Sequence, residues 1–151
     1  MRPNPDLGKH LTLYVDGASR GNPGPSSYGA LLLDESGASL AELSEYIGEA
    51  TNNVAEYQGL LAGLAKALEH SPDHLTVQSD SQLLTHQLLL KYRVKDSKLI
   101  PLFDRAKALL KQFLRVEIVH IPREENRRAD VLANNALERE AARGRGSRPL
   151  P

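Results

Sequence analysis

The chain has 151 residues, 40% of them hydrophobic and 25% charged, which is the usual size and composition of one compact domain with one core. It has no cysteine, so disulfides and thiolate sites are excluded and any metal must use oxygen or imidazole ligands. The 19 basic and 19 acidic residues cancel, which argues against a protein that coats nucleic acid by net charge.

Features that the sequence lacks indicate the cellular compartment of the protein. The N-terminus has no apolar segment, and no run of about 18 apolar residues occurs anywhere, so we expect neither secretion nor membrane insertion. The lack of cysteine agrees with a reducing compartment. We therefore expect a cytoplasmic protein.

The predicted elements begin with three strands, which cover residues 11–17, 28–34 and 38–48. Residues 11–17 alternate apolar and polar side chains, the period of a strand, and this run ends near Asp16. A glycine and proline cluster at residues 21–25 predicts a loop, and Glu35 to Gly37 predict a turn. Successive strands joined by short connections favour an antiparallel meander.

The rest of the chain predicts alternating helices and strands. Helices are expected at residues 53–70, 81–90, 99–113 and from about 126 onward, with strands at 75–80 and 116–121. The order is βββαβααβα, a mixed α/β sheet. We expect residues 1–10 to be an N-terminal extension, 11–140 the domain, and 141–151 a disordered basic tail with nothing to bury.

The charges are segregated along this skeleton. Residues 1–90 carry a net charge of −7, residues 91–115 one of +6, and residues 116–151 one of +1. The basic stretch can bind phosphates while the acidic part binds cations. A solvated helix face with a polar turn is the alternative, and charge counts alone favour it.

Four acids stand at the ends of strands or at the starts of helices. Asp16 and Asp80 close two predicted strands, and the carboxyl ends of neighbouring parallel strands lie together. Glu56 and Asp130 lie in the predicted first turns of helices. Adjacent carboxylates repel each other and persist as anions mainly around a cation, and an all-carboxylate set selects Mg²⁺ or Mn²⁺ over zinc.

Each acid also has a simpler explanation. Asp16 can belong to a turn, Glu56 to a capping box with Asn53, Asp80 to a helix cap, and Asp130 to a solvated helix face. All four explanations would have to hold at once. We therefore favour a single shared site.

The segments around these acids resemble the ordered motifs of type 1 ribonuclease H. They read VDGASRGNPGP with the following YGA, TNNVAEYQGLLAGL, SDSQLL and HIPREENRRADVLANNA, and they span about Leu11 to Glu138. The resemblance implies a ribonuclease H-like fold, a five-stranded mixed sheet with three antiparallel strands followed by two parallel ones, flanked by helices. It also implies an endonuclease that hydrolyses the RNA strand of RNA/DNA hybrids, leaving 3′-hydroxyl and 5′-phosphate ends.

The same resemblance implies a catalytic centre. Two Mg²⁺ ions, with Mn²⁺ as a possible substitute, would be held by Asp16, Glu56, Asp80 and Asp130. Asp16 would bridge both ions, Glu56 would lie beside the leaving group, and Asp130 beside the nucleophile. His120, ten residues before Asp130, is a candidate for assisting catalysis, although a lone strand histidine is more often structural.

Substrate choice requires groups that read the 2′-hydroxyl of RNA, which is both donor and acceptor. The resemblance implies that the hybrid is bound by Gly17, Ala18, Ser19, Arg20, Asn22, Asn52, Asn53 and Gln82. Asn22 and Asn53 also suit a turn and a helix cap. Arg20 and the basic stretch would hold phosphates without reading sequence.

One departure concerns hybrid affinity. Many bacterial members of the family carry a long basic insertion where this chain has only KYRVKDSKL. We expect weaker hybrid binding, compensated by the basic helix at 98–115 or by the tail at 142–151. The alternatives to the enzyme are a catalytically idle hybrid-binding module and a cation-binding regulatory domain without a nucleic-acid partner. We expect a monomer with an RNA/DNA hybrid as partner, and we infer neither a protein partner nor a membrane.

Overall fold

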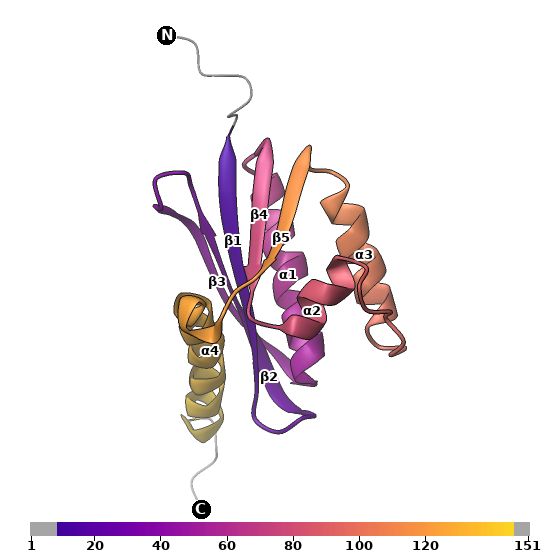
Figure 1. Ribbon diagram of the computed structural model, residues 1–151. Coiled ribbons are helices and arrows are strands. Elements are labelled where there is room, and N and C mark those ends of the chain that lie inside the picture. Colours follow the sequence, from indigo (N-terminus) through magenta and orange to yellow (C-terminus); the bar gives the residue numbers. More distant parts are fainter. Residues whose placement is uncertain (1–8, 147–151) are drawn as a thin grey trace, which may run out of the picture.

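A computed structural model of the chain describes residues 9–146. Its elements are β1 (His10–Ser19), β2 (Gly24–Leu33), β3 (Ser39–Ala50), α1 (Asn52–Leu68), β4 (His74–Ser79), α2 (Gln82–Leu88), α3 (Ile100–Leu110), β5 (Arg115–His120), the 3₁₀ turn η1 (Arg123–Glu125) and α4 (Arg127–Gly146). The predicted order is confirmed, with η1 as an addition before the last helix (Figure 1).

The strands form one mixed sheet in the order β3-β2-β1-β4-β5. β1, β2 and β3 pair antiparallel, whereas β4 runs parallel to β1 and β5 runs parallel to β4. In the register, Val15 of β1 lies opposite Ser79 of β4. Asp16 is the next residue of β1 and Asp80 the first residue after β4, so the two acids lie side by side where the pairing of these strands ends.

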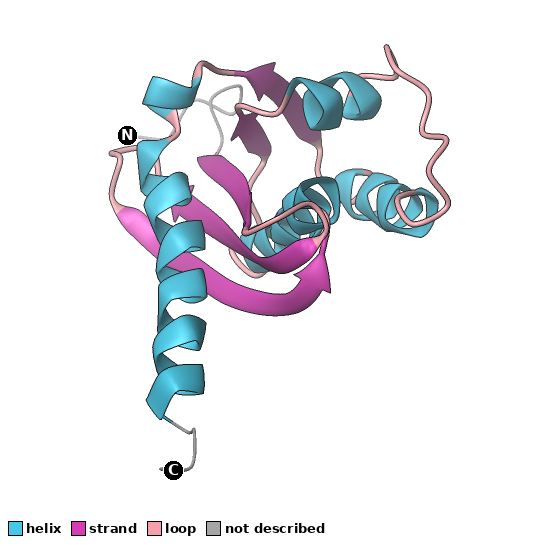
Figure 2. Ribbon diagram, turned by 90° about the horizontal axis from the view of Figure 1, so that it is seen from below, coloured by secondary structure: helices cyan, strands magenta, loops and turns pink. Residues whose placement is uncertain are grey.

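Helices cover both faces of this sheet. α1 packs against β1 and β2, and α3 packs on α1, while α4 lies across β1, β2 and β3 on the opposite face (Figure 2). The main core lies between the sheet and α1, where Leu13 and Val15 meet Leu60 and Leu64. Fully burying one leucine stabilises the fold by about 1.5–3 kcal/mol, so this layer holds the strand ends in place.

The loop at the glycine and proline cluster is shorter than predicted. β2 begins at Gly24 rather than at residue 28, and Gly24 and Pro25 pair with Ala50 and Glu49 of β3. Proline lacks an N–H but keeps its carbonyl, and that of Pro25 accepts the backbone N–H of Arg20 at 2.9 Å. The extended backbone therefore continues through a sequence that is typical of a turn.

Both predicted terminal segments need correction. α4 continues to Gly146, so residues 141–146, which we expected in a disordered tail, are helical; the two alanines and the arginine that open this segment are favourable helix residues. His10 belongs to β1, because its strand pairs with β4. The rest of the predicted tail, 147–151, and of the extension, 1–8, lies outside the described residues.

No helix within residues 9–146 combines the length and the apolar character that crossing a bilayer requires.

Candidate active site

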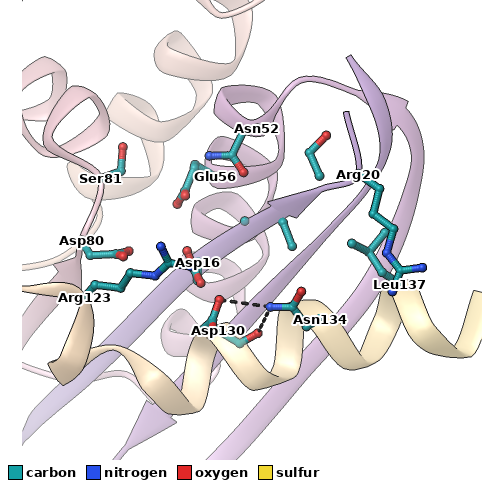
Figure 3. Close-up of a pocket in the computed structure, with 13 residues that line it drawn as sticks. Asp16, Arg20, Asn52, Glu56, Asp80, Ser81, Arg123, Asp130, Asn134 and Leu137 are labelled. Atoms are coloured by element: carbon teal, nitrogen blue, oxygen red, sulfur yellow. Dashed lines mark hydrogen bonds between the residues drawn. The ribbon is translucent and has the colours of Figure 1, made fainter. Parts of the chain in front are cut away.

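Three carboxylates converge where the pairing of β1 with β4 ends. Asp16, Glu56 and Asp80 each place an oxygen within 4.8 Å of the others. Asp16 is 7% and Glu56 3% exposed, while Asp80 is partly buried. They form the floor of an open pocket of about 390 Å³ (Figure 3). Its lining consists of Asp16, Gly17, Ala18, Ser19, Arg20, Asn52, Glu56, Asp80, Ser81, Arg123, Asp130, Asn134 and Leu137.

Two glycines allow the helices to reach the end of β1. A side chain at Gly17 would bring its Cβ within 2.8 Å of the backbone nitrogen of Glu56, so α1 can approach here only because residue 17 has none. Gly29 pairs with Asp16 across β1 and β2, and a Cβ there would collide with the carbonyl of Ala129 in α4. These close approaches bring Glu56 and Asp130 to Asp16 from the two helices.

The start of α1 is held by two side chains. Thr51 is the N-cap, and its hydroxyl accepts the Val54 N–H at 3.2 Å. Asn22, in the turn after β1, accepts the Asn52 N–H through Oδ1 at 3.0 Å. Because the helix begins at Asn52, Glu56 lies beyond the first turn and the capping box that we considered with Asn53 does not form.

Asp80 occupies the turn between β4 and α2 without capping the helix. Ser81 is the N-cap of α2, and its hydroxyl accepts the Leu84 N–H at 3.1 Å. The Asp80 carboxylate instead accepts a hydrogen bond from Asn126 Nδ2 at 3.0 Å. The simpler explanation for Asp80, a helix cap, is therefore wrong.

Asp130 lies in the first turn of α4 and lines the same pocket. Its Oδ1 accepts a hydrogen bond from Asn134 Nδ2, one helical turn further on, at 3.1 Å (Figure 3). It is not a member of the tight cluster of three, but its charge and its contact with Asp16 contribute to raising the Asp16 pKa. The structure thus brings all four predicted acids to one pocket.

The acids are electrostatically unfavourable as bare anions. Burial, followed by the charge of Glu56, raises the pKa of Asp16 from 3.8 to about 9. Burial, followed by the charge of Asp80, raises the pKa of Glu56 from 4.5 to about 8. Among residues 9–146 none of the ion pairs involves these acids, and Glu56 Oε2 is buried without a hydrogen-bond partner.

This donor set fits a hard divalent cation. A cation among the three carboxylates would use the unpaired oxygen of Glu56, and its charge would offset the burial and the repulsion that raise the two pKa values. All candidate ligands are carboxylate oxygens, which suit Mg²⁺ or Mn²⁺ better than zinc. The geometry can therefore hold a metal among Asp16, Glu56 and Asp80.

The predicted substrate-binding residues divide into two groups. Gly17, Ala18, Ser19, Arg20 and Asn52 line the pocket, whereas Asn22, Asn53 and Gln82 lie outside its lining. Within the second group, Asn22 supports α1, and Gln82 donates through Nε2 to the Tyr92 hydroxyl at 3.3 Å.

His120 ends β5 with an exposed side chain. Its Nε2 lies 3.2 Å from the main-chain oxygen of Asp80, within hydrogen-bonding distance, and the residue is outside the pocket lining. The ring therefore contacts the backbone of an acidic residue rather than the space between the acids. Its assistance in catalysis stays a prediction.

Sequence reasoning missed four lining residues and one residue beneath them. The missed lining residues are Ser81, Arg123, Asn134 and Leu137, and Asn126 lies under the acids. Asn126 and Asn134 stand four residues before and after Asp130, a spacing that places side chains on one helix face and was a readable signal. Arg123 had no such signal, because η1 was not predicted.

The rim of the pocket is basic where its floor is acidic. Arg20 follows β1 and Arg123 comes from η1, and in Figure 3 they reach the pocket from opposite ends. An acidic floor for cations with guanidinium groups at the rim suits a phosphodiester, because each guanidinium can donate two hydrogen bonds to phosphate oxygens.

Known proteins are similar to this chain in sequence. Residues 14–136 match the family described as Reverse transcriptase-like. Ribonuclease HI of Halobacterium salinarum is 44% identical over 134 residues, which are 89% of this chain and 67% of that protein. The bifunctional protein Rv2228c of Mycobacterium tuberculosis is 43% identical, and the match spans 85% of this chain but only 35% of that longer protein.

Solved structures of related proteins are similar to this chain in fold. The N-terminal RNase H domain of Rv2228c superimposes with a TM-score of 0.82, covering 84% of this chain and 98% of the other at 43% identity. LC11-RNase H1, isolated from compost and solved in complex with an RNA/DNA hybrid, gives 0.81 at 38% identity, covering 87% of this chain and 99% of that one. The matched family region contains all four acids, and we conclude that the chain belongs to the ribonuclease HI family.

Proposed function

We propose that this chain is a metal-dependent ribonuclease H that hydrolyses the RNA strand of RNA/DNA hybrids and leaves 3′-hydroxyl and 5′-phosphate ends. The observation that carries the proposal is the cluster of Asp16, Glu56 and Asp80, of which the first two are buried and the third is partly buried, in an open pocket with no protein cation paired to them among the described residues. Relatives named ribonuclease HI, and one solved with an RNA/DNA hybrid, support the substrate class.

The four acids would hold two Mg²⁺ ions, with Mn²⁺ as a substitute. The unpaired Glu56 oxygen and the raised pKa values of Asp16 and Glu56 support a cation among the first three acids. Asp130, on the same pocket wall, would complete the set. Bound ions of this kind supply a water nucleophile and stabilise the leaving 3′-oxygen of the scissile phosphate.

The remaining lining residues would bind and orient the strand. Arg123 lines the same pocket as Asp16 and Asp80, where its guanidinium can hold a non-bridging oxygen of the scissile phosphate. Arg20, at the other end, can hold a neighbouring phosphate. A water oxygen would bond to phosphorus and lose a proton, the bond from phosphorus to the 3′-oxygen would break, and the 3′-oxygen would gain a proton.

RNA would be chosen over DNA by groups that both donate and accept near the acids. The Asn52 side chain and the backbone of residues 17–19 line the pocket and can bond a 2′-hydroxyl. Asn22 supports this indirectly by holding the start of α1. Direct contacts of Asn22, Asn53 and Gln82 with the hybrid stay predictions, as do a monomeric state and a cytoplasmic location.

The deciding experiment compares labelled RNA/DNA hybrid with RNA/RNA, DNA/DNA and single-stranded RNA, each in Mg²⁺, Mn²⁺ and chelator. We expect metal-dependent cleavage of the hybrid's RNA strand only, and no cleavage by Asp80→Asn. Binding of the hybrid without cleavage in either metal would instead identify a catalytically idle hybrid-binding module. Metal binding without hybrid binding would favour the regulatory domain.

A further inference from the structure

Asn126 is one of the most deeply buried polar residues among those described, and it is hydrogen-bonded to one of the acids, Asp80. Its side chain is 1% exposed, and it stands between η1 and α4. Its Nδ2 donates to the main-chain oxygen of Val15 at 2.9 Å and to Asp80 Oδ1 at 3.0 Å. One amide nitrogen thus joins β1, the turn after β4 and the start of α4.

The amide can take only this orientation. The main-chain oxygen of Val15 and the carboxylate of Asp80 are both acceptors, so turning the amide over would set oxygen against oxygen. The observed orientation leaves Asn126 Oδ1 buried with no hydrogen-bond partner among the described residues. A buried acceptor without a partner costs free energy of folding. The Asn126 side chain therefore contributes to the structure through the two hydrogen bonds that its Nδ2 donates.

The backbone of Asn126 carries the same connection into α4. Its carbonyl accepts the Asp130 N–H at 3.1 Å, which closes the first turn of the helix. Its own N–H donates to the Arg123 carbonyl at 3.0 Å. The residue that bonds Asp80 therefore also sets the positions of Asp130 and Arg123.

We propose that Asn126 is a positioning residue for the metal site: its amide fixes the direction of the Asp80 carboxylate toward Asp16 and ties the start of α4, with Asp130, to the same sheet edge. The inference rests on the proposed function. It adds a residue that touches neither substrate nor metal and acts through Asp80.

Two substitutions test the role of the amide donor. Asn126→Ala removes it, and Asn126→Asp keeps the shape but presents a carboxylate to two acceptors. Groups that hydrogen-bond a metal-ligating carboxylate change metal affinity by about 10- to 100-fold when they are removed. We expect both variants to lose at least tenfold in Mn²⁺ affinity, measured by calorimetry without nucleic acid, and to lose kcat with little change in KM for the hybrid.

Two controls separate positioning from general damage. Asn135→Asp adds a carboxylate to an exposed position of the same helix, outside the acidic pocket. Gln87→Leu removes a buried amide that accepts the Tyr57 hydroxyl, also outside that pocket. Both should keep parental Mn²⁺ affinity, although Gln87→Leu should lower the thermal midpoint about as much as Asn126→Ala does.

The outcomes are distinguishable. Parental Mn²⁺ affinity and kcat in a folded Asn126→Ala variant overturn the inference while leaving the ribonuclease proposal intact. Weakened Mn²⁺ binding in this variant, with the parent chain binding metal but cleaving no hybrid, supports the inference and overturns the proposed activity. If Gln87→Leu loses Mn²⁺ affinity equally, the effect is only structural, which also overturns the inference. A parent chain that binds no Mn²⁺ overturns both the inference and the proposed function.

Discussion

At the residue scale, the site is built from groups that destabilise one another without a cation. Asp16 and Glu56 are buried side by side, and burial is the largest cause of both raised pKa values. A raised carboxyl pKa means that the folded state binds its proton more tightly than the unfolded state does. Stability, metal binding and pH are therefore linked through these two residues.

The first prediction concerns metal-free stability against pH. The contribution of Asp16 and Glu56 is fully present below their ordinary pKa values of 3.8 and 4.5 and is lost as the pH rises toward about 9 and 8. The slope is at most about 1.4 kcal/mol per pH unit for each proton released. Urea unfolding in chelator from pH 5 to 9 should show this fall in the free energy of unfolding.

The control is the double variant Asp16→Asn, Glu56→Gln, whose amides do not titrate and whose profile should be flatter. Added Mg²⁺ should stabilise the parent more at pH 8 than at pH 6, because the ligands must lose protons to bind it. Identical profiles for the parent and the double variant would show that these carboxyls titrate normally.

The second prediction concerns Arg123, which lines the pocket from η1. Arg123→Ala should lower kcat on the hybrid by about 10²-fold, since charge-assisted contacts to a reacting phosphate contribute on the order of 2–4 kcal/mol. Arg123→Lys should recover part of this rate, because it restores the charge without the two-pronged geometry. An unchanged kcat in Arg123→Ala would place the guanidinium outside the reaction.

At the element scale, the site depends on how closely two helices approach the sheet. α4 touches the sheet at Gly29, where a side chain would strike the helix backbone at Ala129. α1 is similarly close at Gly63, but there the neighbour is the flexible side chain of Leu13. The two sites should therefore differ in their tolerance of an added methyl group.

The third prediction follows from that difference. Gly29→Ala should destabilise the fold by about 1–3 kcal/mol, the usual cost of overpacking, and should lower activity because α4 carries Asp130. Gly63→Ala should cost less, because alanine is preferred to glycine inside a helix by about 1 kcal/mol, and should keep activity. Denaturant unfolding and hybrid cleavage measure both, and equal activity of the two variants would contradict the argument.

At the scale of the whole molecule, charge is divided between the acidic pocket and the basic segment at residues 91–98. This segment joins α2 to α3 and carries Lys91, Arg93, Lys95 and Lys98. Nucleic-acid binding through such residues releases counterions and weakens as salt rises. The alternative, a solvated surface without a ligand, has no such consequence.

The fourth prediction tests that segment. Replacing Lys91, Arg93 and Lys95 by glutamine should weaken hybrid binding and reduce the slope of log affinity against log salt by about 0.7–0.9 for each phosphate that the variant no longer neutralises. The kcat at saturating hybrid should stay unchanged. Lys66→Gln on α1, which removes an exposed charge paired with Glu69, is the control. An unaltered salt slope in the triple variant would favour the solvated surface.

The order of the elements and the identity of the four acids were determined by the sequence alone. Apolar periodicity is a local property, so the first strand and the helix containing Glu56 could be predicted directly, although β1 continues beyond Asp16 to Ser19. The resemblance to type 1 ribonuclease H also rested on contiguous motifs. The ends of the elements were predicted less accurately. β2 begins at Gly24 and α4 includes residues 141–146, because strand pairing and helix extension override the turn-like composition of these segments.

Only the tertiary structure decided how these groups act together. It brought α1 and α4 onto opposite faces, buried Glu56 against Asp16, and placed Arg123 at the rim. It also gave Asn126 its two acceptors, Val15 and Asp80, which lie 111 and 46 residues away in the chain. Burial and hydrogen bonding depend on which surfaces meet, and no local pattern in the sequence encodes a contact between segments so far apart.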